Sequence, residues 1–228
     1  MDLVARLLYR DALMLILDKP AGLPVHAGPK GGPNLAAMLD ALRFGLPRAP
    51  ELAHRLDRGT SGCLVLGRHA KALTTLGRLF AGGKVDKTYW AIVQGSPEAA
   101  EGRIEMALAK RSAERGWWMK PDPAGLPSVT DYRVLGHGDG TSLLELKPLT
   151  GRTHQLRVHC AASGFPILGD TIYGKAPRFG GEPLMLHARR VAVPLYPKRE
   201  PICVEAEPPE PMQALIAATT PLILVETR

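Results

Sequence analysis

Asp57 lies between two arginines in a nine-residue stretch, residues 54–62, that also contains two glycines. Adjacent guanidinium groups favour the ionised form of a carboxylate, which is the form that acts as a nucleophile or a general base. The glycines permit backbone angles that other residues avoid, and the hydroxyls of Thr60 and Ser61 can hydrogen-bond locally. An isolated Arg-x-Asp-Arg is more often a neutralised surface aspartate. The complete stretch predicts instead a rigid turn that presents a reactive carboxylate at the rim of a sheet.

The stretch His54-Arg55-Leu56-Asp57-Arg58-Gly59-Thr60-Ser61-Gly62 resembles the signature of the RluA-type pseudouridine synthases, in which the aspartate is catalytic. Further segments resemble other motifs of that family, and they occur in family order over roughly residues 14–195. These segments are residues 18–26 (Asp-Lys-Pro-Ala-Gly-Leu-Pro-Val-His), 87–91 (Lys-Thr-Tyr-Trp-Ala), 151–159 (Gly-Arg-Thr-His-Gln-Leu-Arg-Val-His), 166–170 with 173–174, and 186–188.

The resemblance implies that the chain isomerises uridine to pseudouridine in RNA without a cofactor or a metal. This reaction breaks the bond between uracil and ribose, turns the base and reattaches it through a ring carbon. It needs a nucleophilic or basic carboxylate and a surface that holds the extruded base. The resemblance assigns the first role to Asp57 and leaves open whether it attacks the sugar or acts as a base. It assigns the second role to Tyr89, which without the motif reads as a half-buried strand tyrosine.

Two arginines complete the site that the resemblance implies. Arg157 corresponds to the family arginine that pairs with the catalytic aspartate, which would orient the carboxylate and keep it ionised. Arg55 corresponds to a residue that fills the gap left by the flipped base in some relatives, and the alternative is that it grips a phosphate. Arg152 and His154 are weaker candidates for phosphate contacts near a helix start, because a structural histidine is the commoner case.

Composition is consistent with an RNA-binding enzyme. The chain has 228 residues, 45% of them hydrophobic and 22% charged, and a net charge of +7 that suits a polyanionic partner. Residues 43–87, which include Asp57, hold nine Lys/Arg against three Asp/Glu. The three cysteines form no C-x-x-C pair and read as reduced thiols, and the short apolar run at 12–17 is neither a signal peptide nor a membrane span. We therefore expect a cytoplasmic protein, a monomer, whose partner is ribosomal or transfer RNA and not a membrane.

The apolar patterns of the chain predict strands interrupted by a few helices. Strands are expected at 13–17, 63–66, 88–93, 184–193 and 201–206, with a hairpin over 129–146. Helices are expected at 35–44 with Asn34 as the N-cap, at 73–80 ending at Gly82-Gly83, at 153–163 ending at Gly164, and after Pro211. In the third helix, His154 and Arg157 would share a face. The pattern predicts an α+β fold with a mainly antiparallel sheet. The family fold, a long mixed sheet with flanking helices and a central active-site cleft, is compatible with it.

The segment between residues 103 and 128 has a looser pattern that mixes basic and aromatic residues. Arg111, Arg115, Trp117, Trp118 and Lys120 are interleaved with Gly and Pro. Such a mixture suits contacts with the RNA backbone and stacking on bases. The alternative is that one or both tryptophans anchor the core of an ordinary hairpin.

We expect residues 1–208 to form the catalytic domain and residues 209–228 to be a C-terminal segment of the same domain. Many relatives carry a small RNA-binding domain before the catalytic motifs, whereas here the first motif begins within about 20 residues of Met1. Recognition is therefore expected to fall to the catalytic domain, with the target uridine in an unpaired loop. The alternative function is a catalytically idle RNA-binding or RNA-remodelling protein on the same fold. The intact Asp57, Tyr89 and Arg157 favour the enzyme.

Overall fold

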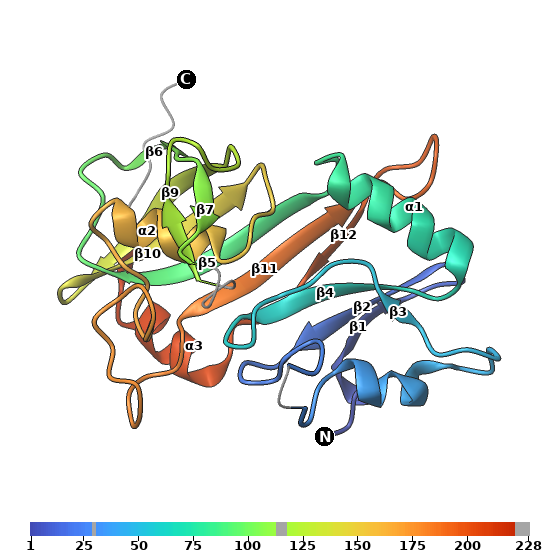
Figure 1. Cartoon of the computed structure of the whole chain (residues 1–228). Helices are drawn as coiled ribbons and strands as arrows, with labels where there is room; N and C mark the ends of the chain where they lie inside the picture. The colour runs from blue at the N-terminus through green and yellow to red at the C-terminus, as the bar shows by residue number, and fades with distance from the viewer. Residues whose placement is uncertain (29–30, 113–117, 222–228) are drawn as a thin grey trace. The chain divides into compact units, whose positions relative to one another are not determined.

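The computed structural model describes residues 1–28, 31–112 and 118–221, and the chain divides into two compact units. The first unit comprises Met1–Thr88 and His187–Pro208. The second comprises Tyr89–Leu186 and Pro209–Arg228. Each unit is thus assembled from two separate stretches of sequence, which Figure 1 distinguishes by colour.

The sheet of the first unit is built from aliphatic runs. β4 is buried along its whole length, as is most of β2, and Figure 1 shows these two strands beside β1. The neighbours β1–β2, β2–β4, β3–β4 and β11–β12 are antiparallel, whereas β4 and β11 are parallel, so the pairing is mixed. The strands are β1 (Leu7–Arg10), β2 (Met14–Lys19), β3 (Glu51–Leu52), β4 (Ser61–Gly67), β11 (Leu186–Val193) and β12 (Ile202–Glu205).

One α-helix, α1 (Ala70–Ala81), packs on β4 of the first unit. A side chain on Gly67 would come within 2.8 Å of the α-carbon of Leu73, so the absence of one lets the helix approach the strand. The helix ends at Gly82, as the sequence predicts, and Gly83 follows with a φ of 64°. Among its described residues, the unit also contains the 3₁₀ helices η1 (Val4–Arg6) and η2 (Ala36–Leu42).

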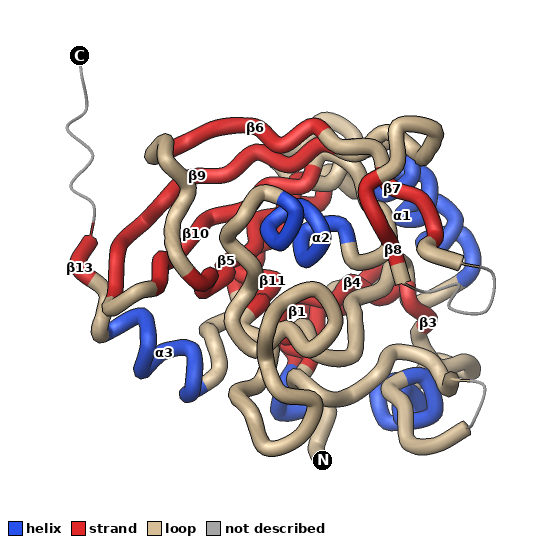
Figure 2. Tube along the Cα trace, turned by 60° about the vertical axis from the view of Figure 1, so that its left-hand side comes forward, coloured by secondary structure: helices blue, strands red, loops and turns tan. Residues whose placement is uncertain are grey.

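The second unit contains an antiparallel sheet whose order is β5-β10-β9-β13, with β6 paired to β9. Figure 2 shows β6, β9 and β10 running alongside one another. The predicted hairpin is confirmed, since β9 and β10 pair from Pro148 back to Thr141 around Asp139-Gly140. The strands are β5 (Asp86–Gln94), β6 (Glu101–Glu105), β9 (Val129–Gly138), β10 (Thr141–Pro148) and β13 (Thr220–Pro221).

The core of the second unit lies where this sheet meets α2 (Gln155–Ala162) and α3 (Glu210–Ala217). Ile92 and Leu144 from the sheet, Leu156 and Cys160 from α2, and Met212 from α3 belong to one buried apolar cluster. Burying such side chains contributes about 1.5–3 kcal/mol each, so this cluster supplies the main stabilisation of the unit. The short helix expected after Pro211 is confirmed, with this proline in its first turn.

A short hairpin of β7 (Leu108–Lys110) and β8 (Met119–Pro121) forms a separate two-stranded sheet in the second unit. The sequence pattern identified neither these strands nor β6, because their apolar runs are too short to show a period. Within the described ranges, no helix has the length and apolar character needed to cross a membrane.

Two predicted helices differ from those observed. The segment 35–44 forms the 3₁₀ helix η2, and the Oδ1 of Asn34 accepts a hydrogen bond from the Ala37 N–H at 3.1 Å. The helix expected from 153 begins only at Gln155, because His154 adopts a left-handed conformation with φ 53°. The prediction that His154 lies on one helix face with Arg157 is therefore wrong. The α+β class and the mainly antiparallel, mixed pairing are confirmed, and the central cleft stays a prediction.

Candidate active site

Asp57 lies in the first unit, in a turn that directly precedes β4. Its carbonyl accepts a hydrogen bond from the Thr60 N–H at 3.1 Å, which closes the turn. The next residue, Arg58, exchanges two hydrogen bonds with Gly22: the Gly22 N–H donates to the Arg58 carbonyl at 2.8 Å, and Arg58 Nε donates to the Gly22 carbonyl at 3.0 Å. The Asp57 turn is thus tied to the loop after β2, and the side chain of Asp57 is half-buried.

Lys19 holds these two loops together from the interior. Its side chain is fully buried, and its Nζ donates to the carbonyls of Pro20, Leu23 and Arg58 at 2.8, 2.9 and 3.3 Å. Burial lowers the pKa of Lys19 to about 8, while the negative charges of Asp57 and Asp18 act in the opposite direction. Lys19 therefore places a buried cation in the electrostatic field of Asp57. In the sequence, this lysine was recognised only as part of a motif, and no role was predicted for it.

The far end of the Asp57 turn is held by residues distant in the chain. Ser61 was expected to hydrogen-bond locally, but its Oγ lies 2.8 Å from Nδ1 of His187. The His187 Nε2 lies 2.9 Å from the carbonyl of Ala206 and must donate to it, so Nδ1 accepts from the Ser61 hydroxyl. Gly62 has a φ of 100°, and a side chain there would clash with the backbone of Ala188. Only glycine fits this crossing of β4 and β11.

His54, the first residue of the signature, has a structural role. Its Nε2 accepts a hydrogen bond from the Val65 N–H at 3.0 Å, and its ring stacks on Phe80 with 4.2 Å between centroids. Burial, together with the positive charge of Lys87, lowers the pKa of His54 to about 3. The ring is therefore neutral at physiological pH. Its neighbour Arg55 is exposed, as both a base-replacing and a phosphate-binding role require.

Tyr89 lies in the second unit, on β5 opposite Leu146 of β10. It is half-buried, and its ring packs against the buried apolar cluster of this unit. This placement agrees with the alternative of a half-buried strand tyrosine, and it also leaves the residue partly exposed. A role in stacking on uracil stays a prediction.

Arg157 is buried on α2 and forms a bidentate ion pair with Asp170. Its Nε and Nη2 donate to the two carboxylate oxygens at 2.8 and 2.7 Å. Burial alone raises the pKa of Asp170, but the hydrogen bonds and charge of Arg157, with the N–H groups of Tyr173 and Ile172, outweigh this and lower it. The carboxylate is therefore ionised. The pairing of Arg157 with Asp57 that the resemblance implies is not tested by these contacts and stays a prediction.

Tyr173 links the Arg157–Asp170 pair to two further segments of the second unit. Its ring centroid lies 5.2 Å from Cζ of Arg157, within the range of a cation–π contact. Its hydroxyl accepts a hydrogen bond from the Met119 N–H at 2.9 Å and lies 2.8 Å from Nδ1 of His154. This contact engages the His154 side chain, whose predicted phosphate contact is untested. The spacing Gly169-Asp170-x-x-Tyr173-Gly174 was the only sequence signal for Asp170 and Tyr173.

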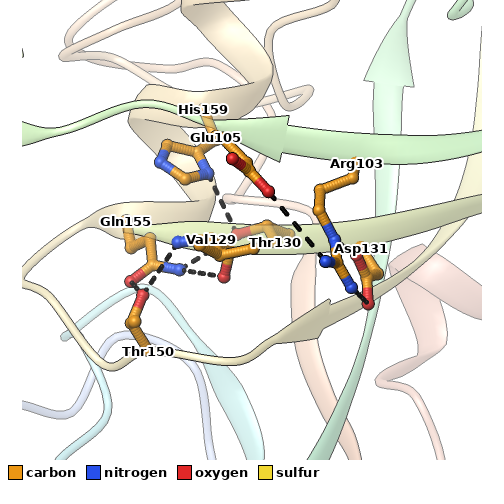
Figure 3. A network of polar contacts seen from close by, with 8 residues as sticks. All are labelled: Arg103, Glu105, Val129, Thr130, Asp131, Thr150, Gln155 and His159. Carbon is orange, nitrogen blue, oxygen red and sulfur yellow. Dashed lines mark hydrogen bonds and ion pairs between the residues drawn. The ribbon is translucent and has the colours of Figure 1, made fainter. Parts of the chain in front are cut away.

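A buried polar network fixes the start of α2 to β9, as Figure 3 shows. Gln155 Nε2 donates to the carbonyl of Val129 and to the hydroxyl of Thr130, at 2.9 and 3.0 Å. Its Oε1 accepts from the Thr150 hydroxyl at 2.7 Å. The Thr130 hydroxyl in turn bonds with Nδ1 of the fully buried His159 at 3.0 Å. The loop that precedes Arg157 is therefore positioned by side chains that hydrogen-bond to the sheet.

The basic and aromatic segment at 111–120 lies partly outside the described residues, since Arg115 and Trp117 fall within 113–117. Arg111 is exposed, with its Cζ 5.7 Å from the ring of the half-buried Trp118. The Lys120 Nζ forms an exposed ion pair with Asp122 at 3.0 Å. Both expected roles of this segment, RNA contact and hairpin anchor, stay predictions.

The expected site residues are divided between the units: Arg55 and Asp57 belong to the first, and Tyr89 and Arg157 to the second. Comparison with known proteins relates the chain to one family. A family model described as RNA pseudouridylate synthase matches residues 13–162, a span that includes all four residues.

Individual relatives agree with this match. An uncharacterized RNA pseudouridine synthase of Zymomonas mobilis is 44% identical over 210 residues, covering 91% of this chain and 95% of the relative. The ribosomal large subunit pseudouridine synthase C of Vibrio cholerae is 37% identical over 193 residues, covering 81% of this chain and 60% of the relative. The solved structure of human RNA pseudouridylate synthase domain containing 4 superposes with a TM-score of 0.79 at 28% identity, covering 95% and 93% of the two chains. The chain therefore belongs to the RNA pseudouridylate synthase family and is an isomerase that acts on uridine in RNA.

Proposed function

We propose that this chain converts a uridine in an unpaired loop of ribosomal RNA to pseudouridine, with Asp57 as the reactive carboxylate. The names of two relatives favour ribosomal RNA over transfer RNA as the substrate: those from Vibrio cholerae and Haemophilus ducreyi are both named ribosomal large subunit pseudouridine synthase C. Action as a monomer in the cytoplasm stays a prediction.

The observation that carries this proposal is the construction of the Asp57 turn. The carbonyls of Asp57 and of the next residue, Arg58, are held by hydrogen bonds from Thr60, Gly22 and the buried Lys19, whereas Asp57 itself remains partly exposed. A catalytic carboxylate needs this combination, because it must reach the substrate from a fixed position. A surface aspartate that only balanced neighbouring charge would not need a buried lysine beneath its backbone.

The reaction is an isomerisation and requires no oxidant or reductant. The bond from N1 of uracil to C1′ of ribose breaks, a bond from C5 to C1′ forms, and the proton on C5 is replaced by one on N1. Asp57 starts this sequence either by attacking C1′ or by acting as a base that eliminates uracil. In the first route Asp57 forms a bond to C1′, whereas in the second it removes a proton from the ribose. Isotopic substitution of the ribose hydrogens would distinguish the two routes.

Tyr89, Arg157 and Arg55 are proposed to serve the same uridine. Tyr89 would stack on the extruded base through the exposed part of its ring, and stacking on an aromatic side chain is worth about 1–3 kcal/mol per base. Arg157 would supply positive charge, and its pairing with Asp170 would hold the guanidinium in one orientation. Arg55, exposed beside Asp57, would replace the flipped base or grip a phosphate.

The target is proposed to be unpaired because extrusion of a base costs least where no pair has to be broken. The deep major groove of an RNA helix also denies side chains access to base edges, so selective readers favour loops and ends. Two stem-loops that are identical except for the pairing of the target uridine test this directly. We expect conversion of the loop form only, and equal rates on both forms would contradict the proposal.

The decisive experiment compares wild-type protein with Asp57→Asn on ribosomal RNA from cells that lack the gene, followed by mapping of pseudouridine. We expect the wild type to modify a defined uridine and Asp57→Asn to lose at least about a thousandfold in rate, because the reactive carboxylate is absent. The variant should keep its thermal transition and most of its affinity for RNA, since phosphate contacts dominate binding. Asp86→Asn, an exposed aspartate at the start of β5, is the matched control.

Each result has a definite meaning. Appreciable turnover by Asp57→Asn would remove this residue from the chemistry. Binding without conversion by the wild type on every ribosomal and transfer RNA would favour the alternative, a catalytically idle RNA-binding protein. Conversion restricted to transfer RNA would keep the reaction and overturn the proposed substrate.

A further inference from the structure

The segment 174–181, between α2 and β11, carries the most exposed large hydrophobic side chain in the part of the chain that the structure describes. This residue is Phe179, which is 85% exposed. Leaving a phenylalanine in water forgoes about 1.5–3 kcal/mol of burial free energy. Scattered exposed aliphatic residues are ordinary on protein surfaces, so exposure alone assigns no role. The surroundings of Phe179 provide the further observations.

The loop around Phe179 is basic. Lys175 and Arg178 are both exposed, and Cζ of Arg178 lies 5.9 Å from the centroid of the Phe179 ring. The segment 174–181 itself contains no acidic residue, and Glu182 follows it. An exposed ring beside a cation, in a loop with a second cation, matches the chemistry of RNA, in which flat bases alternate with phosphates. An apolar protein partner would not favour two cations at this position.

The loop is closed at its base. The Met185 N–H donates to the carbonyl of Leu168 at 2.9 Å, and Gly169 lies so close to the backbone of Pro183 that a side chain there would clash. The loop also folds on itself, since a side chain on Gly181 would come within 2.8 Å of Cγ of Pro177. Figure 1 shows the segment between α2 and β11 as an orange loop that extends from the other elements of its unit.

The beginning of the loop is anchored to the Arg157–Asp170 pair. Asp170 accepts hydrogen bonds from the N–H groups of Ile172 and Tyr173 at 2.9 and 3.0 Å, in addition to its ion pair with Arg157. A side chain on Gly174 would come within 2.7 Å of the Asp170 carbonyl. Phe179 is therefore presented by a loop whose first residues are fixed by the same contacts that orient Arg157.

We propose that residues 174–181 form an RNA-binding loop in which the ring of Phe179 stacks on an unpaired base of the substrate, while Lys175 and Arg178 contact the flanking phosphates. This inference rests on the proposed function and extends it by naming a contact with a base other than the target uridine. Stacking is tolerant of base identity, so the loop contributes affinity and position more than sequence selectivity.

The test measures the dissociation constant of a stem-loop substrate for Phe179→Ala, Phe179→Trp and wild type. We expect the alanine variant to bind about tenfold more weakly, because one stacking contact is lost, and the tryptophan variant to bind as wild type does. Leu8→Ala, which truncates another exposed hydrophobic residue on β1, is the control for loss of apolar surface. All variants are compared by thermal unfolding first.

A double-mutant cycle identifies the base. Each loop position of the RNA is made abasic in turn, and one of these changes should weaken binding to wild type while having no further effect on Phe179→Ala. Additive losses at every position would overturn the stacking contact, as would wild-type binding by Phe179→Ala. If the wild type binds the stem-loop but modifies no uridine in any RNA, the proposed function fails, whereas the Phe179 cycle still reports on the loop.

Discussion

Asp57 and Arg157, two of the charged residues expected at the site, are held by different kinds of interaction. The turn of Asp57 is fixed through its backbone, by hydrogen bonds to main-chain groups and by the close approach of Gly62 to Ala188. Arg157 is fixed through its side chain, by a buried ion pair with Asp170 and the ring of Tyr173. A backbone-held carboxylate keeps its position when its own side chain is changed, whereas a guanidinium held by partners depends on each of them.

This difference predicts where substitutions will damage the fold. In the first unit, the sensitive positions should be the groups beneath the turn, such as Lys19, and not Asp57 itself. In the second unit, the sensitive position should be Asp170, because removing one member of a buried pair leaves the other charge poorly compensated. The following predictions run from the largest expected effect to the smallest.

Asp170→Asn should destabilise the protein by about 3 kcal/mol, because it removes the charge opposite the buried Arg157 while preserving the shape of the side chain. Urea denaturation measures this loss. Asp131→Asn is the matched control, since Asp131 also forms a bidentate pair with an arginine, Arg103 at 2.6 and 3.0 Å, but in an exposed position. Its loss should be much smaller. Equal losses for the two variants would show that burial does not govern the importance of the Arg157 pair.

Lys19→Met should lower the free energy of unfolding by about 2 kcal/mol, because the carbonyls of Pro20, Leu23 and Arg58 lose a charged donor. Removal of a buried ammonium group offsets part of this loss. Lys71→Met, an exposed lysine on α1, is the control and should be close to neutral. Chemical denaturation measures the free energy of unfolding of both variants. Wild-type stability of Lys19→Met would mean that the Asp57 turn holds its form without the lysine.

Tyr173→Phe should lower the free energy of unfolding by about 1 kcal/mol. It removes the hydroxyl that accepts a hydrogen bond from the Met119 N–H, but it keeps the ring beside Arg157. Hydrogen exchange should accelerate at the Met119 amide. Tyr173→Leu, which also removes the ring, should cost more and disturb Arg157 as well. If the two variants behave alike, the ring contributes nothing to holding the guanidinium.

Acidification should destabilise the first unit through His54. Its folded pKa of about 3 lies below the ordinary value of 6.5, so the folded state binds fewer protons than the unfolded state between these values. Stability is therefore lost as the pH falls from 6.5 towards 3. These two pKa values set an upper limit of about 2 kcal/mol for the stability lost between pH 7 and 5. His54→Gln should flatten the dependence of stability on pH in this range. An unchanged dependence would show that His54 is not the group responsible.

The amino-acid sequence by itself determined the local elements. Aliphatic runs gave β2 and β4, the Gly82-Gly83 pair ended α1, and Asp139-Gly140 between two alternating segments gave the β9–β10 hairpin. These features follow from backbone propensity and apolar period over a few neighbouring residues. The order of the motifs along the chain was likewise sufficient to predict the family to which the chain belongs.

Only the tertiary structure decided which side chains are partners. Arg157 is 13 residues from Asp170, Lys19 is 39 residues from the Arg58 carbonyl, and Ser61 is 126 residues from His187. Such choices depend on how strands and loops pack, and no local pattern encodes them. The left-handed start of α2 at His154 has the same origin, because Tyr173 engages its ring and the side chain of Gln155 accepts the Arg152 N–H ahead of the helix. A residue's type can suggest a charge or a ring, but its partner is set by the fold.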